Sequence, residues 1–143
     1  MIEKRQISRK TKVSKKITDI GHPYYKLGRL NKTVADKAKI KAADIYIDRN
    51  HILHIQKEHA KELESLGIKA LDFVQTIVNN YNQIRKGTGD SILLIVYHND
   101  LHNTAAMQLN YAVDKEFWEV KTAQPRKTSK LRGVEILLEI KKE

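Results

Sequence analysis

The sequence contains no cysteine, which excludes disulfide bridges, thiolate metal ligands and cysteine nucleophiles. It has only two prolines, and no apolar run approaches the roughly 18 residues that a membrane-spanning helix requires. The start of the chain shows no apolar segment followed by a cleavage site, so we expect no signal peptide. These absences predict a cytoplasmic protein without a membrane partner.

Acidic residues are scarce relative to basic ones. Asp and Glu number 17 against 27 Lys and Arg, which gives a formal net charge of +10. Such an excess on a small domain suits a polyanion, most commonly nucleic acid and next an anionic membrane surface; the alternative is that the charge serves solubility alone. We interpret residues 1–30 as a basic arm and loop, which either contacts phosphates or is a solvated terminus. Residues 31–143 then form a single domain.

Hydrophobic periodicity predicts helices first and strands afterwards. Tyr24 and Tyr25 fall in a loop marked by glycine and proline, and Asp48 or Asn50 caps the helix that ends at Gly67. The first predicted elements are a short helix over 33–42, a strand over 44–48, a helix from about 50 to 66 and a second helix over 69–81. Four strands follow, over 82–87, 91–97, 104–113 and 117–123, and Pro125 ends the last of them. Residues 134–140 form either an edge strand or a closing helix.

This order predicts an α+β fold in which N-terminal helices pack on one face of a four-stranded antiparallel meander. Alternation places Trp118, Val120 and Thr122 on one face of the last of these strands, and Glu119 and Lys121 on the other. The face away from the helices then carries polar and mostly cationic side chains.

Histidines are concentrated in the segment HILHIQKEH, residues 51–59. On an ideal helix His59 lies in the middle of the apolar face, and His54 lies about 140° away from it, at the border of the polar side. A histidine in an apolar stripe is a candidate for function. The alternative is that His59 is a core histidine bonded to a backbone carbonyl.

Histidine is the usual general acid or base at neutral pH. Metal-independent RNA cleavage needs a base for the 2′-hydroxyl, an acid for the leaving oxygen and cations for the phosphorane. His54 and His59 can supply the proton transfers, and Thr122 a hydroxyl for a phosphate oxygen. We expect the nucleic-acid contacts to come from Arg85, Lys86, Lys121, Arg126 and Lys127.

A metal site and a nucleotide-hydrolysing loop are less well supported. The histidine spacing does not match HExxH, and no nearby carboxylate is evident that would complete a ligand set. We therefore expect no metal and no cofactor. The only glycine-rich stretch, GTGD at residues 87–90, lies between two predicted strands and not between a strand and a helix.

The segment HIQKEH, with His54, Ile55 and His59, resembles the HIxxxH helix signature of phage-associated nuclease domains grouped with barnase, EndoU, colicin and RelE-type RNases. The resemblance extends over residues 44 to about 130 and includes a last strand ending in Val-x-Thr-Ala, here Val120 to Ala123. It implies helices on one face of a four-stranded antiparallel sheet and metal-independent RNA cleavage. It also implies that His54, His59 and Thr122 are functional, with Arg85 or Lys86.

These observations favour a ribonuclease of the toxin or phage-associated kind, encoded by a bacterial host, phage or prophage. Its partner would be RNA, including tRNA or mRNA, and a lethal enzyme would need an inhibitor, for which an acidic protein is the natural candidate. The alternatives are a nucleic-acid-binding module without chemistry and a phage interaction protein on the same fold.

Overall fold

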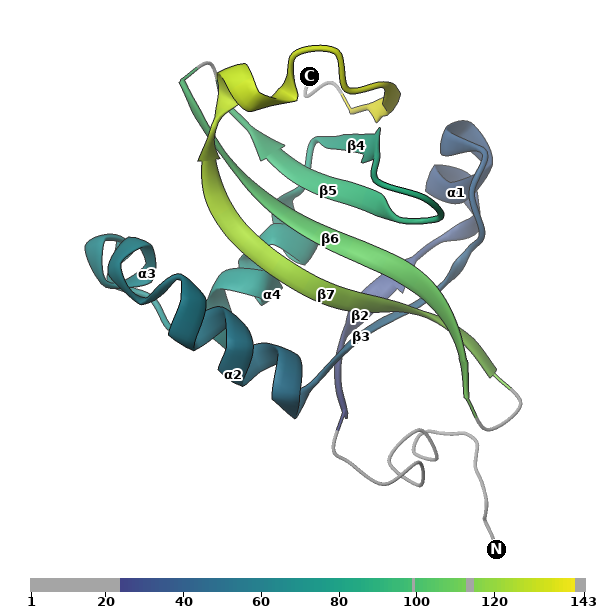
Figure 1. Cartoon of the computed structure of the whole chain (residues 1–143). Helices are drawn as coiled ribbons and strands as arrows, with labels where there is room; N and C mark the ends of the chain where they lie inside the picture. The colour runs from purple at the N-terminus through teal and green to yellow at the C-terminus, as the bar shows by residue number, and fades with distance from the viewer. Residues whose placement is uncertain (1–23, 99, 113–114, 141–143) are drawn as a thin grey trace, which may run out of the picture.

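The computed structural model describes residues 24–98, 100–112 and 115–140, so the basic arm over residues 1–16 lies outside it. Within the described part, four α-helices and seven strands form one α+β unit (Figure 1). The strands are β2 (Tyr24–Leu30), β3 (Ala43–Asp48), β4 (Gln83–Lys86), β5 (Ile92–Tyr97), β6 (Leu101–Ala112), β7 (Lys115–Lys127) and β8 (Ile136–Glu139). The helices are α1 (Lys32–Ala38), α2 (Arg49–Glu58), α3 (Ala60–Leu66) and α4 (Ala70–Asn80), with a short 3-10 helix, η2 (Thr128–Leu131).

The strands form a single mixed sheet in the order β2-β3-β7-β6-β5-β4-β8. The pair β3 and β7 is parallel, and the other described neighbours are antiparallel. The predicted four-stranded meander with N-terminal helices is therefore wrong. Residues 24–30, predicted as a loop, form β2 instead, and β3 returns beside β7. The strand β3 pairs with β7 across about 70 residues, and β2 pairs with β3; local periodicity reveals neither pairing.

The ends of the helices, unlike the sheet, follow from capping residues close in the sequence. Asp48 is the N-cap of α2, and its side chain accepts a 2.7 Å hydrogen bond from the backbone N–H of His51. Gly67 ends α3 with φ +68°, a conformation in which glycine lacks the Cβ penalty. The single helix predicted between these caps is interrupted at His59, where φ −123° and ψ +29° separate α2 from α3.

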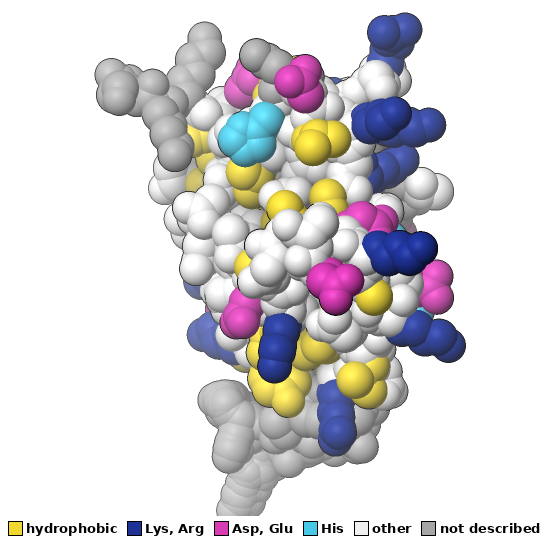
Figure 2. Space-filling model, turned by 90° about the vertical axis from the view of Figure 1, so that its left-hand side faces the viewer, with side chains coloured by type: hydrophobic (Ala, Val, Ile, Leu, Met, Phe, Trp, Pro, Cys, Tyr) yellow, Lys and Arg dark blue, Asp and Glu magenta, His cyan; other side chains and the backbone are white. Residues whose placement is uncertain are grey.

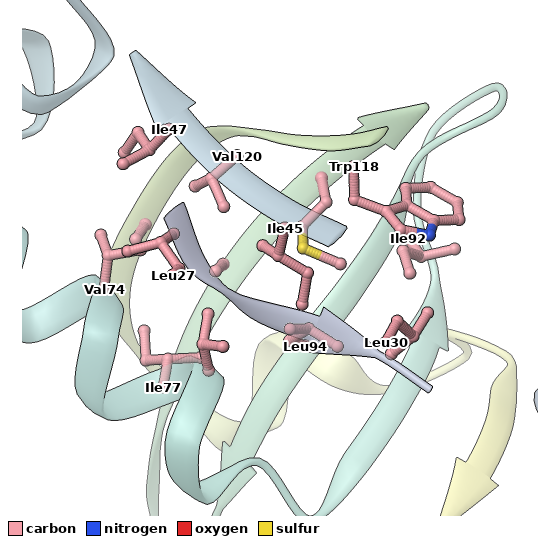
Figure 3. Packing of buried hydrophobic residues seen from close by; sticks show 14 of the residues in the cluster. Leu27, Leu30, Ile45, Ile47, Val74, Ile77, Ile92, Leu94, Trp118 and Val120 are labelled. Atoms are coloured by element: carbon pink, nitrogen blue, oxygen red, sulfur yellow. The ribbon is translucent and has the colours of Figure 1, made fainter. Parts of the chain in front are cut away.

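The hydrophobic core lies between one face of the sheet, here called the inner face, and α4. Figure 3 shows Val74 and Ile77 of α4 near Leu27 of β2 and Val120 of β7. Leu94, at the centre of β5, is also fully buried there. Each fully buried aliphatic side chain contributes about 1.5–3 kcal/mol, so this layer provides the main hydrophobic stabilisation.

The opposite face, here called the outer face, carries the polar side chains, and a β-bulge changes its composition. Ala106 pairs with Thr122 and Met107 with Val120, so Lys121 is an extra residue on β7. Thr122 therefore lies on the outer face, together with Glu119. The predicted placement of Thr122 with Val120 is wrong because a bulge interrupts the two-residue alternation.

The strand β7 also continues beyond Pro125, which was predicted to end it. Proline lacks a backbone N–H and is tolerated where a strand has a neighbour on one side only. The described pairing of β3 with β7 covers only residues 117–119, so β7 is an edge strand at Pro125, with β6 beside it. Residues 134–140 were predicted as either an edge strand or a closing helix, and they contain a short edge strand, β8.

Residues 128–135 pass over the outer face at one end of β5 and β6 (Figure 1). Leu131 of η2 is buried there, and Ile95 of β5 is fully buried on the same face. Part of the outer face is thus covered, and only the remainder is open to a ligand. Among the described residues, no helix has the length and apolar character needed to cross a membrane.

Candidate functional site

A basic groove runs along the open part of the outer face. Its volume is about 770 Å³, and four cations line it: Lys86 of β4, Lys121 and Arg126 of β7, and Lys130 of η2. One carboxylate, Glu135, also lines it. Figure 2 views the molecule from the left of Figure 1, and Lys and Arg side chains gather along its right-hand edge, the side that faces the viewer in Figure 1. We call this feature the outer groove.

The outer groove brings together three of the five residues predicted to contact nucleic acid: Lys86, Lys121 and Arg126. Thr122 lies on the same face, opposite Ala106, which lines the groove. Lys127 is exposed near the end of β7 and does not line it. Lys130 was not predicted, because a lysine in an irregular C-terminal segment has no periodicity that would place it.

A buried carboxylate, Glu119, lies beside the groove. Its side chain is 3% exposed. Lys121 Nζ lies 2.9 Å from Oε1, and Asn110 Nδ2 donates to the same oxygen at 2.7 Å. The Tyr24 hydroxyl donates to Oε2 at 3.3 Å. Burial and the nearby Glu119 raise the pKa of Tyr24 above its usual range, so this phenol stays protonated as a donor.

His51 completes this cluster from α2. Its Nδ1 lies 3.0 Å from Asp48 Oδ1 and 3.5 Å from Glu119 Oε2. The His51 side chain is 27% exposed, whereas those of the two carboxylates are 6% and 3% exposed. One edge of the imidazole thus faces two buried acids while the ring still reaches the surface. The two carboxylates thus border the ring on its buried side, although Nδ1 forms no hydrogen bond with a described residue.

The same three side chains are the candidate metal ligands of the described part of the chain. Asp48, His51 and Glu119 each offer one ligand atom, and these atoms lie within 4.8 Å of one another. The expectation that no nearby carboxylate completes a ligand set with these histidines is therefore wrong, because the fold brings Glu119 from β7. Lys121 lies 2.9 Å from Glu119 Oε1 and already offsets the charge of this carboxylate.

The two histidines predicted to be catalytic lie apart from each other. His54 is exposed on α2, three residues after His51 and therefore on the same side of the helix. His59 lies at the break between α2 and α3, where its side chain is 16% exposed and Nδ1 is 3.5 Å from Glu62 Oε2. His54 thus lies about one helical turn from His51, and His59 lies at a helix junction.

Arg85, predicted to contact nucleic acid, is buried instead. It is 8% exposed, and its guanidinium donates to Gln83 Oε1 at 2.9 Å and to the carbonyl oxygens of Leu131 at 3.2 Å and Val134 at 3.0 Å. Arg85 therefore attaches the segment over residues 128–135 to β4. The alternation of β4 correctly placed Arg85 on the outer face, but the sequence did not show that this segment covers it.

This placement makes Arg85 a stability residue. We expect Arg85→Met to lower the free energy of unfolding by about 2–3 kcal/mol, because it leaves buried carbonyl oxygens without their donor. The adjacent, exposed Lys86 provides a matched control, and Lys86→Met is expected to change stability by less than about 0.5 kcal/mol. Urea denaturation of both variants measures the difference. Equal stability of the two would contradict the attachment role.

His102 of β6 is a buried histidine, opposite Arg126 of β7. It is 1% exposed, and neither of its ring nitrogens forms a hydrogen bond with a described residue. Burial, together with the positive charges of Arg126 and Arg85, lowers the pKa of His102 to about 4. His102 therefore stays neutral in the folded protein at physiological pH.

The sequence showed Asp48 and His51 as individual residues, but it did not show that they contact Glu119. Asp48 was identified as a helix cap and His51 as part of the histidine segment, but nothing linked them to Glu119. The one available signal was Glu119 itself, a carboxylate in an otherwise β-forming strand next to Lys121. Comparison of the chain with protein-family models, with curated proteins and with solved structures finds no match in any of the three. The resemblance to the nuclease domains therefore stays a prediction.

Proposed function

We propose that the protein binds RNA along the outer groove and cleaves it without a metal ion. The observation that carries this proposal is the position of His51, a partly exposed imidazole whose Nδ1 faces Asp48 and Glu119 beside the cationic groove. A histidine held in this way is suited to transfer protons to and from a bound substrate. Lys121, which lies 2.9 Å from Glu119 Oε1, is suited to bind the phosphate.

In the proposed reaction, His51 accepts the proton of a 2′-hydroxyl through its other ring nitrogen, Nε2. The 2′-oxygen then attacks the adjacent phosphorus, and the bond to the 5′-oxygen of the next nucleotide breaks. His54 protonates that leaving oxygen. The products are a 2′,3′-cyclic phosphate and a free 5′-hydroxyl, so atoms and charges balance without a co-reactant.

The remaining residues have supporting roles in this proposal. Lys121, which lies 2.9 Å from Glu119 Oε1, offsets the extra negative charge of the phosphorane, and Thr122 offers a hydroxyl to a phosphate oxygen. Arg126 lies seven residues after Glu119 along β7 and binds a neighbouring phosphate of the RNA strand. Asp48 and Glu119 are positioning residues, since both are buried and reach the substrate only through His51. His59 has no part in the chemistry.

The test is incubation of the purified protein with total RNA in excess chelator. We expect cleavage that leaves 2′,3′-cyclic phosphate ends, and loss of most RNA affinity in the Lys121→Ala/Arg126→Ala/Lys130→Ala variant, with a shallower salt dependence. Cleavage that appears only after a divalent ion is added would assign a metal to Asp48, His51 and Glu119. Salt-sensitive binding without cleavage would favour the second candidate function, a binding module, which the cationic groove supports by itself.

A further inference from the structure

A second groove lies on the side of the molecule where the turn between β4 and β5 comes near α1 (Figure 1). Its volume is about 730 Å³. Four lysines line it: Lys37, Lys39 and Lys41 from α1 and the segment after it, and Lys86 from β4. Partly buried apolar side chains, including Ile40, Leu109 and Leu137, form its floor. We call it the lysine pocket.

The lysine pocket adjoins the outer groove. Lys86, Ser91, Gln108 and Glu135 line both of them. A ligand that follows the outer groove to Lys86 therefore reaches residues that also line the lysine pocket. The seven cations along this path, Lys130, Arg126, Lys121, Lys86, Lys37, Lys39 and Lys41, come from four parts of the chain. Lys41 also pairs with Glu116 at 3.0 Å, so it is in part compensated.

Lys39 has an unusual backbone. Its φ of +61° and ψ of +43° place it in the left-handed region at the end of α1. Among the described residues it is the one non-glycine residue with a positive φ. Glycine is the usual residue at this position of a helix end. A lysine that accepts this strain at the rim of a cationic pocket is a candidate for function, because strained residues concentrate at ligand sites.

We propose that the lysine pocket binds the continuation of the single RNA strand held by the outer groove. This inference rests on the proposed function. The lysines take phosphates, and the apolar floor takes a base that is out of the stack. Two carboxylates, Asp90 and Glu135, also line the pocket, and they repel phosphates but accept hydrogen bonds from base amino groups. A duplex offers no free base to such a floor, so the pocket selects single strands.

The variant Lys39→Gly tests this proposal without endangering the fold. Glycine adopts the left-handed conformation without strain, so we expect a melting temperature equal to or above that of the unmodified protein. The ligands are 2′-O-methyl RNA strands of about 4 and about 16 nucleotides, which lack the nucleophilic hydroxyl and are not cleaved. Lys61→Ala on α3 removes the same charge far from both grooves and serves as the matched control.

We expect the unmodified protein and Lys61→Ala to bind the longer strand more tightly than the shorter one. In Lys39→Gly the affinity for the longer strand should fall about 3–10-fold, and its salt slope should decrease by about 0.7. Equal affinity of Lys39→Gly and Lys61→Ala for the longer strand would contradict RNA binding by the lysine pocket. Cleavage of unmodified RNA would still support the proposed function in that case. Absence of binding at both lengths by the unmodified protein overturns both. An equal loss of affinity for duplex RNA overturns the selection of single strands.

Discussion

His51→Gln is expected to lower the rate of RNA cleavage by about 10²–10⁴-fold, the usual contribution of a positioned general acid or base. Glutamine keeps a polar side chain of similar reach but cannot exchange protons near neutral pH. The outer groove is unchanged in this variant, so the affinity for RNA should stay within about twofold of the unmodified protein. Single-turnover cleavage rates and direct binding measurements separate the two effects.

Two further variants make this prediction specific. His54→Gln should also slow cleavage, because it removes the group that protonates the leaving oxygen. His98→Gln, in the exposed loop after β5, removes a histidine outside the cluster and should leave the rate unchanged. Full activity of His51→Gln would remove His51 from the mechanism, and a loss restricted to a His59→Gln variant would restore the assignment made from the sequence alone.

Acid is expected to destabilise the protein through His102. In the unfolded chain this histidine takes up a proton near its ordinary pKa of 6.5, whereas burial lowers its pKa to about 4 in the folded protein. The folded state therefore binds fewer protons than the unfolded state between these two values. Stability is full above about pH 6.5 and is lost as the pH falls toward about 4, by up to about 3 kcal/mol.

The measurement is urea denaturation at pH 7.5 and at pH 4.5, for the unmodified protein and for His102→Gln. Other groups titrate in this range, so the informative quantity is the difference between the two proteins in the pH dependence of stability. Glutamine does not bind a proton in this range. The stability of His102→Gln should therefore fall less between pH 7.5 and pH 4.5 than that of the unmodified protein, by most of the ~3 kcal/mol given above. Identical pH dependence in both proteins would show that His102 titrates in the same way folded and unfolded.

The histidine helix shows which predictions a sequence supports. The N-cap was predicted as Asp48 or Asn50, and the structure shows Asp48; the end at Gly67 was predicted correctly. Both features depend on the chemistry of one residue and its immediate neighbours. The role of His59 was predicted from an uninterrupted helix. The break at that residue changes its direction, and the position of one histidine on a helical wheel loses its meaning once the helix is interrupted.

The strand β7 shows what a pattern within one strand cannot predict. Its alternation correctly placed Trp118 and Val120 toward the core and Glu119 away from it. The bulge at Lys121 then moved Thr122 to the face of Glu119. A bulge depends on how two strands fit each other, so a pattern within one strand cannot reveal it. The parallel pairing of β3 with β7 is likewise a contact between distant segments.

By itself, the sequence determined the basic charge, the capped helices, the strands β3 to β7 and the cationic side chains Lys86, Lys121 and Arg126 that line the outer groove. Each of these follows from composition or from interactions between residues close in the chain. The tertiary structure alone decided that β2 and β3 join the sheet, that Arg85 is buried under residues 128–135, and that Glu119 meets His51. These features depend on contacts between residues separated by tens of positions, and the free energy of such contacts comes from burial and pairing that exist only in the folded chain.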